Sequence, residues 1–133
     1  MVKILIFVDT SFIIAFVNDN DGRHKEAVEL AKIIENEEKV VSYMIIVEVL
    51  NNLRKFKKGK LNQEVYRIIK DNFKIQEESI NLYDDALMTQ LKYHGKLGFA
   101  DCVIIETMKR LNLNQIASFD QHFDGKEGIV RIS

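Results

Sequence analysis

The feature that most constrains the fold of this chain is an apolar run near its start, from Ile4 to Val8, which is rich in β-branched residues. A strand that is buried on both faces of a parallel sheet shows such a continuous run, whereas a strand with one solvated face alternates between apolar and polar residues. An acidic residue, Asp9, follows the run directly. We therefore expect a buried parallel strand with a carboxylate at its end.

Further along the chain, short apolar segments alternate with stretches of helical periodicity. The predicted helices span 12–17, about 24–38, 44–56, 61–73, 82–93 and 99–111, and the predicted strands span 40–41, 115–119 and 129–132, with a short strand about residue 75. This alternation predicts an α/β domain with a mostly parallel sheet. The chain has 133 residues and contains neither repeats nor a linker, so we expect one domain over residues 1–133.

The composition narrows the class of protein. Hydrophobic residues make up 47% and charged residues 29% of the chain, which is typical of a globular protein. A lone cysteine, Cys102, cannot form an internal disulfide, which favours a reducing, cytoplasmic setting. We expect no contact with a membrane, because no apolar segment approaches the roughly 20 residues that a bilayer crossing needs. A net charge of −1 argues against general electrostatic binding of nucleic acid, but not against local contacts with RNA.

Two acidic residues stand directly after predicted strands. Asp9 follows the first strand, and Asp120 follows the strand that ends at Phe119. Ligands of open parallel sheets bind in the crevice outside the carboxyl ends of the strands, so both carboxylates are expected at that edge. An aspartate after a strand can equally cap a helix or form an Asx-turn, and this alternative stays open for each residue.

Two further acids lie on apolar helices. Glu48 is the only charged residue between Met44 and Leu50, so this part of the helix is expected to be buried, with Glu48 on a polar face beside Asn51 and Asn52 and away from an Ile46–Leu50–Leu53 stripe. Asp101 stands at the start of a stripe that continues through Ile104, Ile105 and Met108. A surface position for Glu48 and a helix-cap role for Asp101 are the alternatives.

Four carboxylates gathered at one site would repel one another unless a cation neutralised them. A set of oxygen ligands favours Mg²⁺ or Mn²⁺, whereas zinc prefers cysteine and histidine. Cys102 is alone, and the three histidines, His24, His94 and His122, show no ligand spacing. We interpret the histidines as surface or capping residues and expect Mg²⁺ or Mn²⁺ at the acidic site.

Four segments of the chain resemble those of PIN-domain nucleases, and most closely those of the small VapC-type toxins. They are Val8-Asp9-Thr10-Ser11, then Ser42 with Glu48 six residues later, then Phe99-Ala100-Asp101, and finally Ser118-Phe119-Asp120-Gln121-His122-Phe123. Each motif is short, but their order and spacing match over nearly the whole chain.

The resemblance implies a three-layer α/β/α sandwich with a central, mostly parallel sheet. It implies that Asp9, Glu48, Asp101 and Asp120 are the catalytic and metal-binding acids, with Thr10, Ser11 and Ser118 as supporting hydroxyls. The implied activity is that of a Mg²⁺- or Mn²⁺-dependent endoribonuclease that leaves 5′-phosphate and 3′-hydroxyl ends. The implied partners are an RNA substrate, a small antitoxin protein and a second copy in a homodimer.

The densest basic run of the sequence follows the helix that carries Glu48. Arg54, Lys55, Lys57 and Lys58 are candidates for contact with RNA, together with Lys60, Lys92 and Lys96. The alternative is structural, because cations stabilise a helix C-terminus and Gly59 is an ordinary C-cap.

Other classes fit the sequence less well. A haloacid-dehalogenase-like phosphatase would carry a second aspartate where Ser11 stands, and a receiver domain would carry an acidic pair at the first strand and an acceptor aspartate on a middle strand. A calcium loop starting near Asp19 would need a glutamate where Val28 stands. The rival that remains is a PIN-like domain that binds RNA or a protein without cutting.

Overall fold

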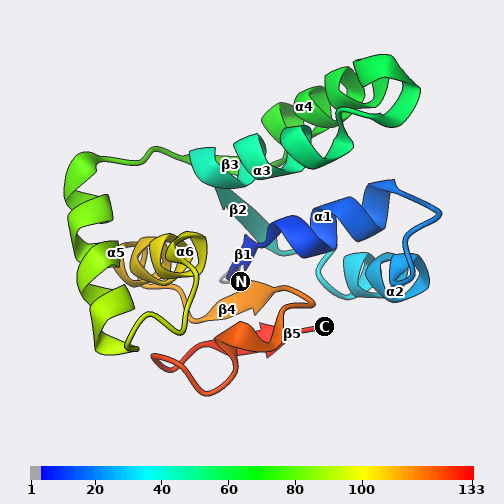
Figure 1. Cartoon of the computed structure of the whole chain (residues 1–133). Coiled ribbons are helices and arrows are strands. Elements are labelled where there is room, and N and C mark those ends of the chain that lie inside the picture. The colour runs from blue at the N-terminus through cyan, green and yellow to red at the C-terminus, as the bar shows by residue number, and fades with distance from the viewer. Residues whose placement is uncertain (1–3) are drawn as a thin grey trace.

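In the computed structural model, which describes residues 4–133, a five-stranded sheet lies between two layers of helices (Figure 1). In chain order the elements are β1 (Leu5–Val8), α1 (Thr10–Val17), α2 (His24–Ile33), β2 (Glu38–Ser42), α3 (Tyr43–Leu53), η1 (Phe56–Gly59), α4 (Lys60–Asn72), β3 (Lys74–Gln76), α5 (Ile80–Lys92), α6 (Phe99–Arg110), β4 (Gln115–Ala117), η2 (Gln121–Phe123) and β5 (Val130–Ile132). The predicted three-layer α/β/α sandwich is confirmed.

The strand predicted from the first apolar run is the middle strand of the sheet. The strand order is β3-β2-β1-β4-β5, and every neighbouring pair is parallel. Phe7 of β1 aligns with Val40 of β2 on one side and with Ile116 of β4 on the other, and all three are fully buried. The chain places β2 and β3 on one side of β1, and then β4 and β5 on the other side. The crevice between the ends of β1 and β4 is therefore a topological switch point.

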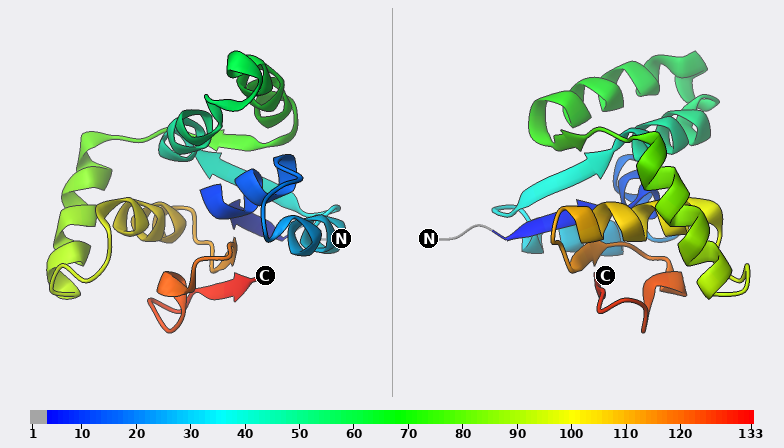
Figure 2. Two further views of the ribbon diagram at one scale, coloured as in Figure 1. Left: turned by 45° about the vertical axis from the view of Figure 1, so that its right-hand side comes forward. Right: turned by 90° about the vertical axis from the view of Figure 1, so that its left-hand side faces the viewer.

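The helices divide between the two faces of the sheet. Right-handed crossovers place the helices between β1 and β3 on one face and those between β3 and β4 on the other. Figures 1 and 2 show α1 and α2 on one side of the sheet and the α5–α6 pair on the other. None of the helices in residues 4–133 has the length and hydropathy that a membrane crossing requires.

Several predicted boundaries were wrong. The second helix ends at Ile33 because Glu38 already pairs with Leu5 in the sheet. The helix that carries Glu48 ends at Leu53, three residues early, and the chain turns through Lys57 and Lys58, whose φ angles are 51° and 53°. The first helix begins at Thr10, two residues before its predicted start, so Thr10 and Ser11 form the first turn of α1.

Candidate active site

Two serine hydroxyls hold the carboxylate of Asp9 between the ends of β1 and β4. Ser118 Oγ donates to Asp9 Oδ2 at 2.7 Å, and Ser11 Oγ donates to the same oxygen at 3.0 Å. The backbone of Asp9 occupies the N-cap position of α1, but its side chain makes no capping hydrogen bond. The cap interpretation of Asp9 is therefore wrong, and the buried carboxylate joins two neighbouring strands.

The same two hydroxyls also fix the segment after β4. Ser11 Oγ accepts a hydrogen bond from the amide of Phe119 at 3.0 Å, and Ser118 Oγ accepts one from the amide of Asp120 at 2.9 Å. Each serine thus connects Asp9 to the backbone that carries Asp120. Two of the three predicted supporting hydroxyls lie in direct contact with an acid of the predicted quartet.

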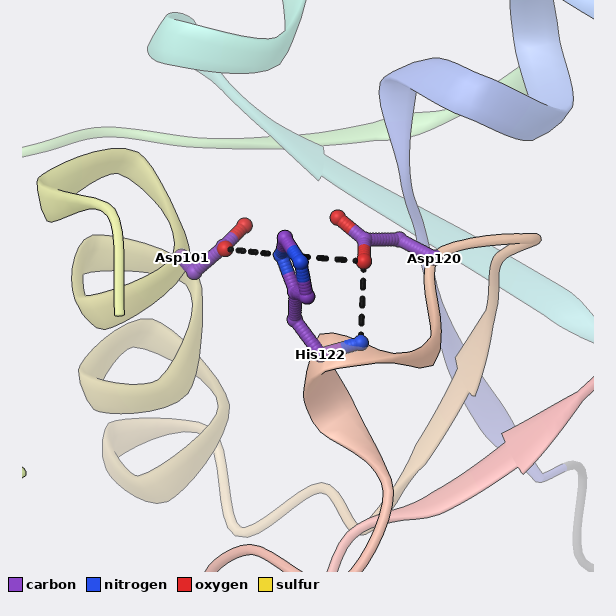
Figure 3. A group of neighbouring side chains, drawn as sticks. All are labelled: Asp101, Asp120 and His122. Carbon is purple, nitrogen blue, oxygen red and sulfur yellow. Dashed lines mark hydrogen bonds and ion pairs between the residues drawn. The ribbon is translucent and has the colours of Figure 1, made fainter. Parts of the chain in front are cut away.

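Figure 3 shows the imidazole of His122 between the carboxylates of Asp101, on α6, and Asp120, after β4. His122 Nδ1 lies 3.3 Å from Asp101 Oδ2 and 3.1 Å from Asp120 Oδ1. Asp120 also accepts a hydrogen bond from the amide of His122 at 2.9 Å, so its Asx-turn interpretation is correct as well. Asp101 is the third residue of α6, whose N-cap position belongs to Gly98, so the cap interpretation of Asp101 is wrong.

Glu48 approaches the same site from α3, and its side chain is partly buried. The charges of Asp9 and Asp101 both act on its carboxyl group, and the Thr10 side chain lies beside it. The four predicted acids therefore come from four separate segments and act on one another at the carboxyl edge of the sheet.

Glu48 lies near the other predicted acids, but the sequence argument that led to it was partly wrong. The buried stripe of α3 is Ile45–Val49–Leu53 rather than Ile46–Leu50–Leu53. The helix is not buried all round, since the side chain of Val47 is 66% exposed. Asn51 and Asn52, predicted to share an enclosed polar face with Glu48, are exposed.

The electrostatics of the site disfavour the charged state of Asp9, Glu48 and Asp101. Burial, followed by the charge of Asp120, raises the pKa of Asp9 above its ordinary value, although the hydrogen bonds from Ser118 and Ser11 oppose the rise. Burial also raises the pKa of Glu48, and the charges of Asp9 and Asp101 add to this effect.

The same holds for Asp101, whose pKa is raised by burial and then by the charge of Asp120, with His122 opposing the rise. Among residues 4–133, no lysine or arginine forms an ion pair with any of the four acids. The chain leaves a cluster of partly buried carboxylates without a strong internal cation.

One buried hydroxyl at the same edge has no hydrogen-bond partner in the described part of the chain. It is Ser42 Oγ, at the end of β2. Buried polar atoms usually find a partner, so an orphaned hydroxyl beside an acidic site indicates a missing ligand or water. Carboxylates and hydroxyls are oxygen donors of the kind that bind Mg²⁺ and Mn²⁺, so the residues present fit a divalent cation.

Sequence reasoning missed His122 as a member of this cluster. One ligand atom from each of Asp101, Asp120 and His122 lies within 4.8 Å of the others. The signal was local, because a residue two positions after Asp120 is brought back toward the carboxylate by the Asx-turn. The contact with Asp101, 21 positions away, depends on the tertiary fold.

The predicted RNA-contact run is not brought to the acidic cluster. Arg54, Lys55, Lys57 and Lys58 lie at the turn between α3 and α4, at the end of the helical hairpin that points away from α6 and β4 (Figures 1 and 2). Lys92, a further candidate, pairs with Glu127 at 2.9 Å. Asp124, directly after η2, pairs with Arg131 at 2.8 Å.

Comparisons with known proteins agree with this architecture. The PIN domain family model matches residues 6–128. A comparison with curated protein sequences finds no significant match.

Among solved structures, the chain is similar to VapC20 from Mycobacterium tuberculosis, a sarcin-ricin loop cleaving toxin, with 20% identity, a TM-score of 0.83 and coverage of 96% of this chain and 98% of that one. It is also similar to VapBC2 from Rickettsia felis (16% identity, TM-score 0.71, coverage of 97% and 98%) and to a toxin-antitoxin complex from Klebsiella pneumoniae (21%, 0.69, 94% and 95%). These similarities extend over the whole fold. The chain belongs to the PIN-domain family.

Proposed function

We propose that this chain acts, as a single domain, as a metal-dependent endoribonuclease and as the toxin of a toxin–antitoxin pair. The observation that supports the proposal most strongly is the set of four carboxylates at the switch point of the sheet, which have no lysine or arginine partner in residues 4–133. Acids whose pKa is raised by burial and by like charges, as for Asp9, Glu48 and Asp101, are typical of catalytic sites. A chain under selection for stability alone would pair or remove them.

In this proposal Asp9, Glu48, Asp101 and Asp120 hold Mg²⁺ or Mn²⁺. When bound, such an ion activates water for in-line attack on a phosphodiester and stabilises the charge on the leaving 3′ oxygen. Ser11 and Ser118 orient the carboxylate of Asp9 through hydrogen bonds of 3.0 and 2.7 Å. Because water is the nucleophile, the ribose 2′-hydroxyl is not consumed, and the products carry 5′-phosphate and 3′-hydroxyl ends.

The similar structures support the choice of substrate and partner. VapC20 is a toxin that cleaves the sarcin-ricin loop, which favours RNA as the substrate class. The similar structures from Rickettsia felis and Klebsiella pneumoniae are toxin–antitoxin complexes, which favours a small antitoxin as a partner of this chain. Exposed apolar side chains on α5, namely Ile80, Leu87, Met88 and Leu91, offer a surface for a protein contact such as a homodimer.

Cleavage of single-stranded RNA by the purified chain tests the proposal. We expect cleavage with Mn²⁺, none with EDTA, and product ends that carry 5′-phosphate and 3′-hydroxyl groups. Asp9→Asn should abolish cleavage, because it removes a carboxylate that the serines orient toward the site. Cleavage that persists in EDTA, or that leaves 2′,3′-cyclic phosphates, would contradict the proposed chemistry.

A matched control separates loss of the site from general damage. Asp71 is an exposed aspartate on α4, outside the cluster. Asp71→Asn should therefore cleave RNA as the unmodified chain does. If the unmodified chain binds RNA but does not cut it under any divalent cation, the non-cleaving PIN-like domain becomes the better description.

A further inference from the structure

His122 stands outside the acidic quartet, yet it makes the shortest contacts to two of the acids. Its Nδ1 atom lies 3.1 Å from Asp120 and 3.3 Å from Asp101, although 67% of its side chain is exposed. Figure 3 shows the ring between the two carboxylates, which come from opposite sides of the crevice. An exposed histidine gains little from such a position by packing alone, so its placement has to come from the surrounding contacts.

Those contacts hold the backbone on either side of His122. Asp120 accepts a hydrogen bond from its amide at 2.9 Å, and Lys126 Nζ donates to its carbonyl at 3.0 Å. Five residues later, Glu127 is bound by Lys109 of α6 at 2.7 Å, so the segment is attached to the helix that carries Asp101. These contacts fix the turn that carries His122 and hold its imidazole next to the acids.

A second observation indicates that the cluster takes a ligand. Ser42 Oγ, at the end of β2, is fully buried and has no hydrogen-bond partner in residues 4–133. Ser42 directly precedes α3, the helix that carries Glu48, so this hydroxyl lies at the same carboxyl edge of the sheet as the acids. A buried hydroxyl without a partner is uncommon and points to a group that binds there.

Building on the proposed nuclease function, we propose that His122 Nδ1 is a ligand of the cation held by Asp101 and Asp120, and that it makes the site select a first-row transition ion over Mg²⁺. Mg²⁺ prefers oxygen ligands throughout, whereas imidazole nitrogen favours the first-row transition metals. One nitrogen among several carboxylates shifts the preference toward Mn²⁺ and the heavier ions without excluding Mg²⁺. The alternative role for His122 is that of a protonated counter-ion, which would lose contact with the acids when a metal binds.

Electron spin-echo spectroscopy of the Mn²⁺-loaded chain tests the proposal without any measurement of cleavage. A directly bound imidazole gives a ¹⁴N coupling to Mn²⁺. We expect this coupling in the unmodified chain and its loss in His122→Asn, which replaces the imidazole nitrogen by an amide oxygen as the available ligand atom. His94→Asn is the matched control, since His94 is exposed and its φ of 56° suits asparagine, and it should keep the coupling.

Competition binding gives the second readout. His122→Asn should weaken Mn²⁺ binding by at least about tenfold and Mg²⁺ binding by less than about threefold. If Mn²⁺ binds, is lost in Asp101→Asn, and shows no ¹⁴N coupling in the unmodified chain, the role of His122 is overturned while the nuclease proposal stands. If no Mn²⁺ binds at all, both proposals fail.

Discussion

A single carboxylate, Glu127, and the acidic cluster are both partly buried, but their electrostatic surroundings are opposite. Glu127, in the turn before β5, accepts from Lys109 at 2.7 Å, from Lys92 at 2.9 Å and from the hydroxyl of Tyr93 at 2.9 Å. Lys109 and Lys92 hold the pKa of Glu127 at about 2. In the acidic cluster, by contrast, burial and like charges raise the pKa of Asp9 and Asp101.

The difference shows what each group contributes to the fold. Glu127 has a structural role, because its ion pairs connect the turn before β5 to Lys92 of α5 and Lys109 of α6, and its side chain is only 13% exposed. We call this set of contacts the clasp. Within residues 4–133 the acidic cluster has no ion pair with a lysine or arginine, and it is expected to weaken the fold until an external cation binds. In the proposed account, one fold contains a carboxylate that stabilises it and carboxylates that bind a cation.

The largest expected effect concerns catalysis. Asp101→Asn should lower the rate of RNA cleavage at saturating Mn²⁺ by at least about 10²-fold, because an electrostatic group at the reacting phosphate is lost. Single-turnover cleavage of a labelled RNA measures the rate, with the exposed Asp71→Asn as control. A loss of less than threefold would show that Asp101 is not a catalytic residue. The contrast drawn between Glu127 and the acidic cluster would then not hold.

The next effect concerns the clasp. Glu127→Gln should lower the free energy of unfolding by about 2 kcal/mol, since hydrogen bonds to a charged group are lost and two lysines stay close together. Urea denaturation in EDTA measures the change. Glu26→Gln is the matched control, because Glu26 also forms an ion pair, with Arg23 at 3.0 Å, but both side chains are more than half exposed. The control should cost less than about 0.5 kcal/mol; equal losses would show that Glu127 is an ordinary surface charge.

A smaller effect of opposite sign is expected in the cluster. In EDTA at neutral pH, Asp101→Asn should raise the free energy of unfolding by about 1 kcal/mol, because a charge that burial and Asp120 disfavour is removed. The same urea experiment measures it. A destabilised Asp101→Asn variant would mean that this carboxylate holds the fold together, as Glu127 does.

The smallest effects are the changes of the unfolding free energy with pH, and their signs differ between Glu127 and Asp101. The pKa of Glu127 is lowered in the folded state, so its contribution is complete above about pH 4.5 and is lost as the pH falls toward 2. The pKa of Asp101 is raised, so the folded chain keeps that proton longer than the unfolded chain, and stability falls as the pH rises from 3.8 through the raised value. Unfolding free energies of the two variants and the unmodified chain across this range should therefore diverge in opposite directions.

The sequence was sufficient for the architecture because the buried run 4–8 and the alternation of helices and strands reflect how parallel sheets are built. It also placed Asp9 and Asp120 together, since parallel strands end at the same edge. The contact of His122 with Asp101 and the clasp of Glu127 could not be predicted. Each depends on side chains from separate elements that become neighbours only in the folded chain.

A Mn²⁺ titration of thermal stability, run in parallel on the unmodified chain and on Asp101→Asn, tests the central claim most directly. Without metal the variant should be the more stable of the two. With metal the order should invert, because a ligand that binds only the folded state stabilises it by about 2.7 kcal/mol at 100 times its Kd, and only the unmodified chain keeps the complete set of acids. A flat titration of the unmodified chain up to millimolar Mn²⁺, or an equal rise in both proteins, would contradict a metal site at the acidic cluster.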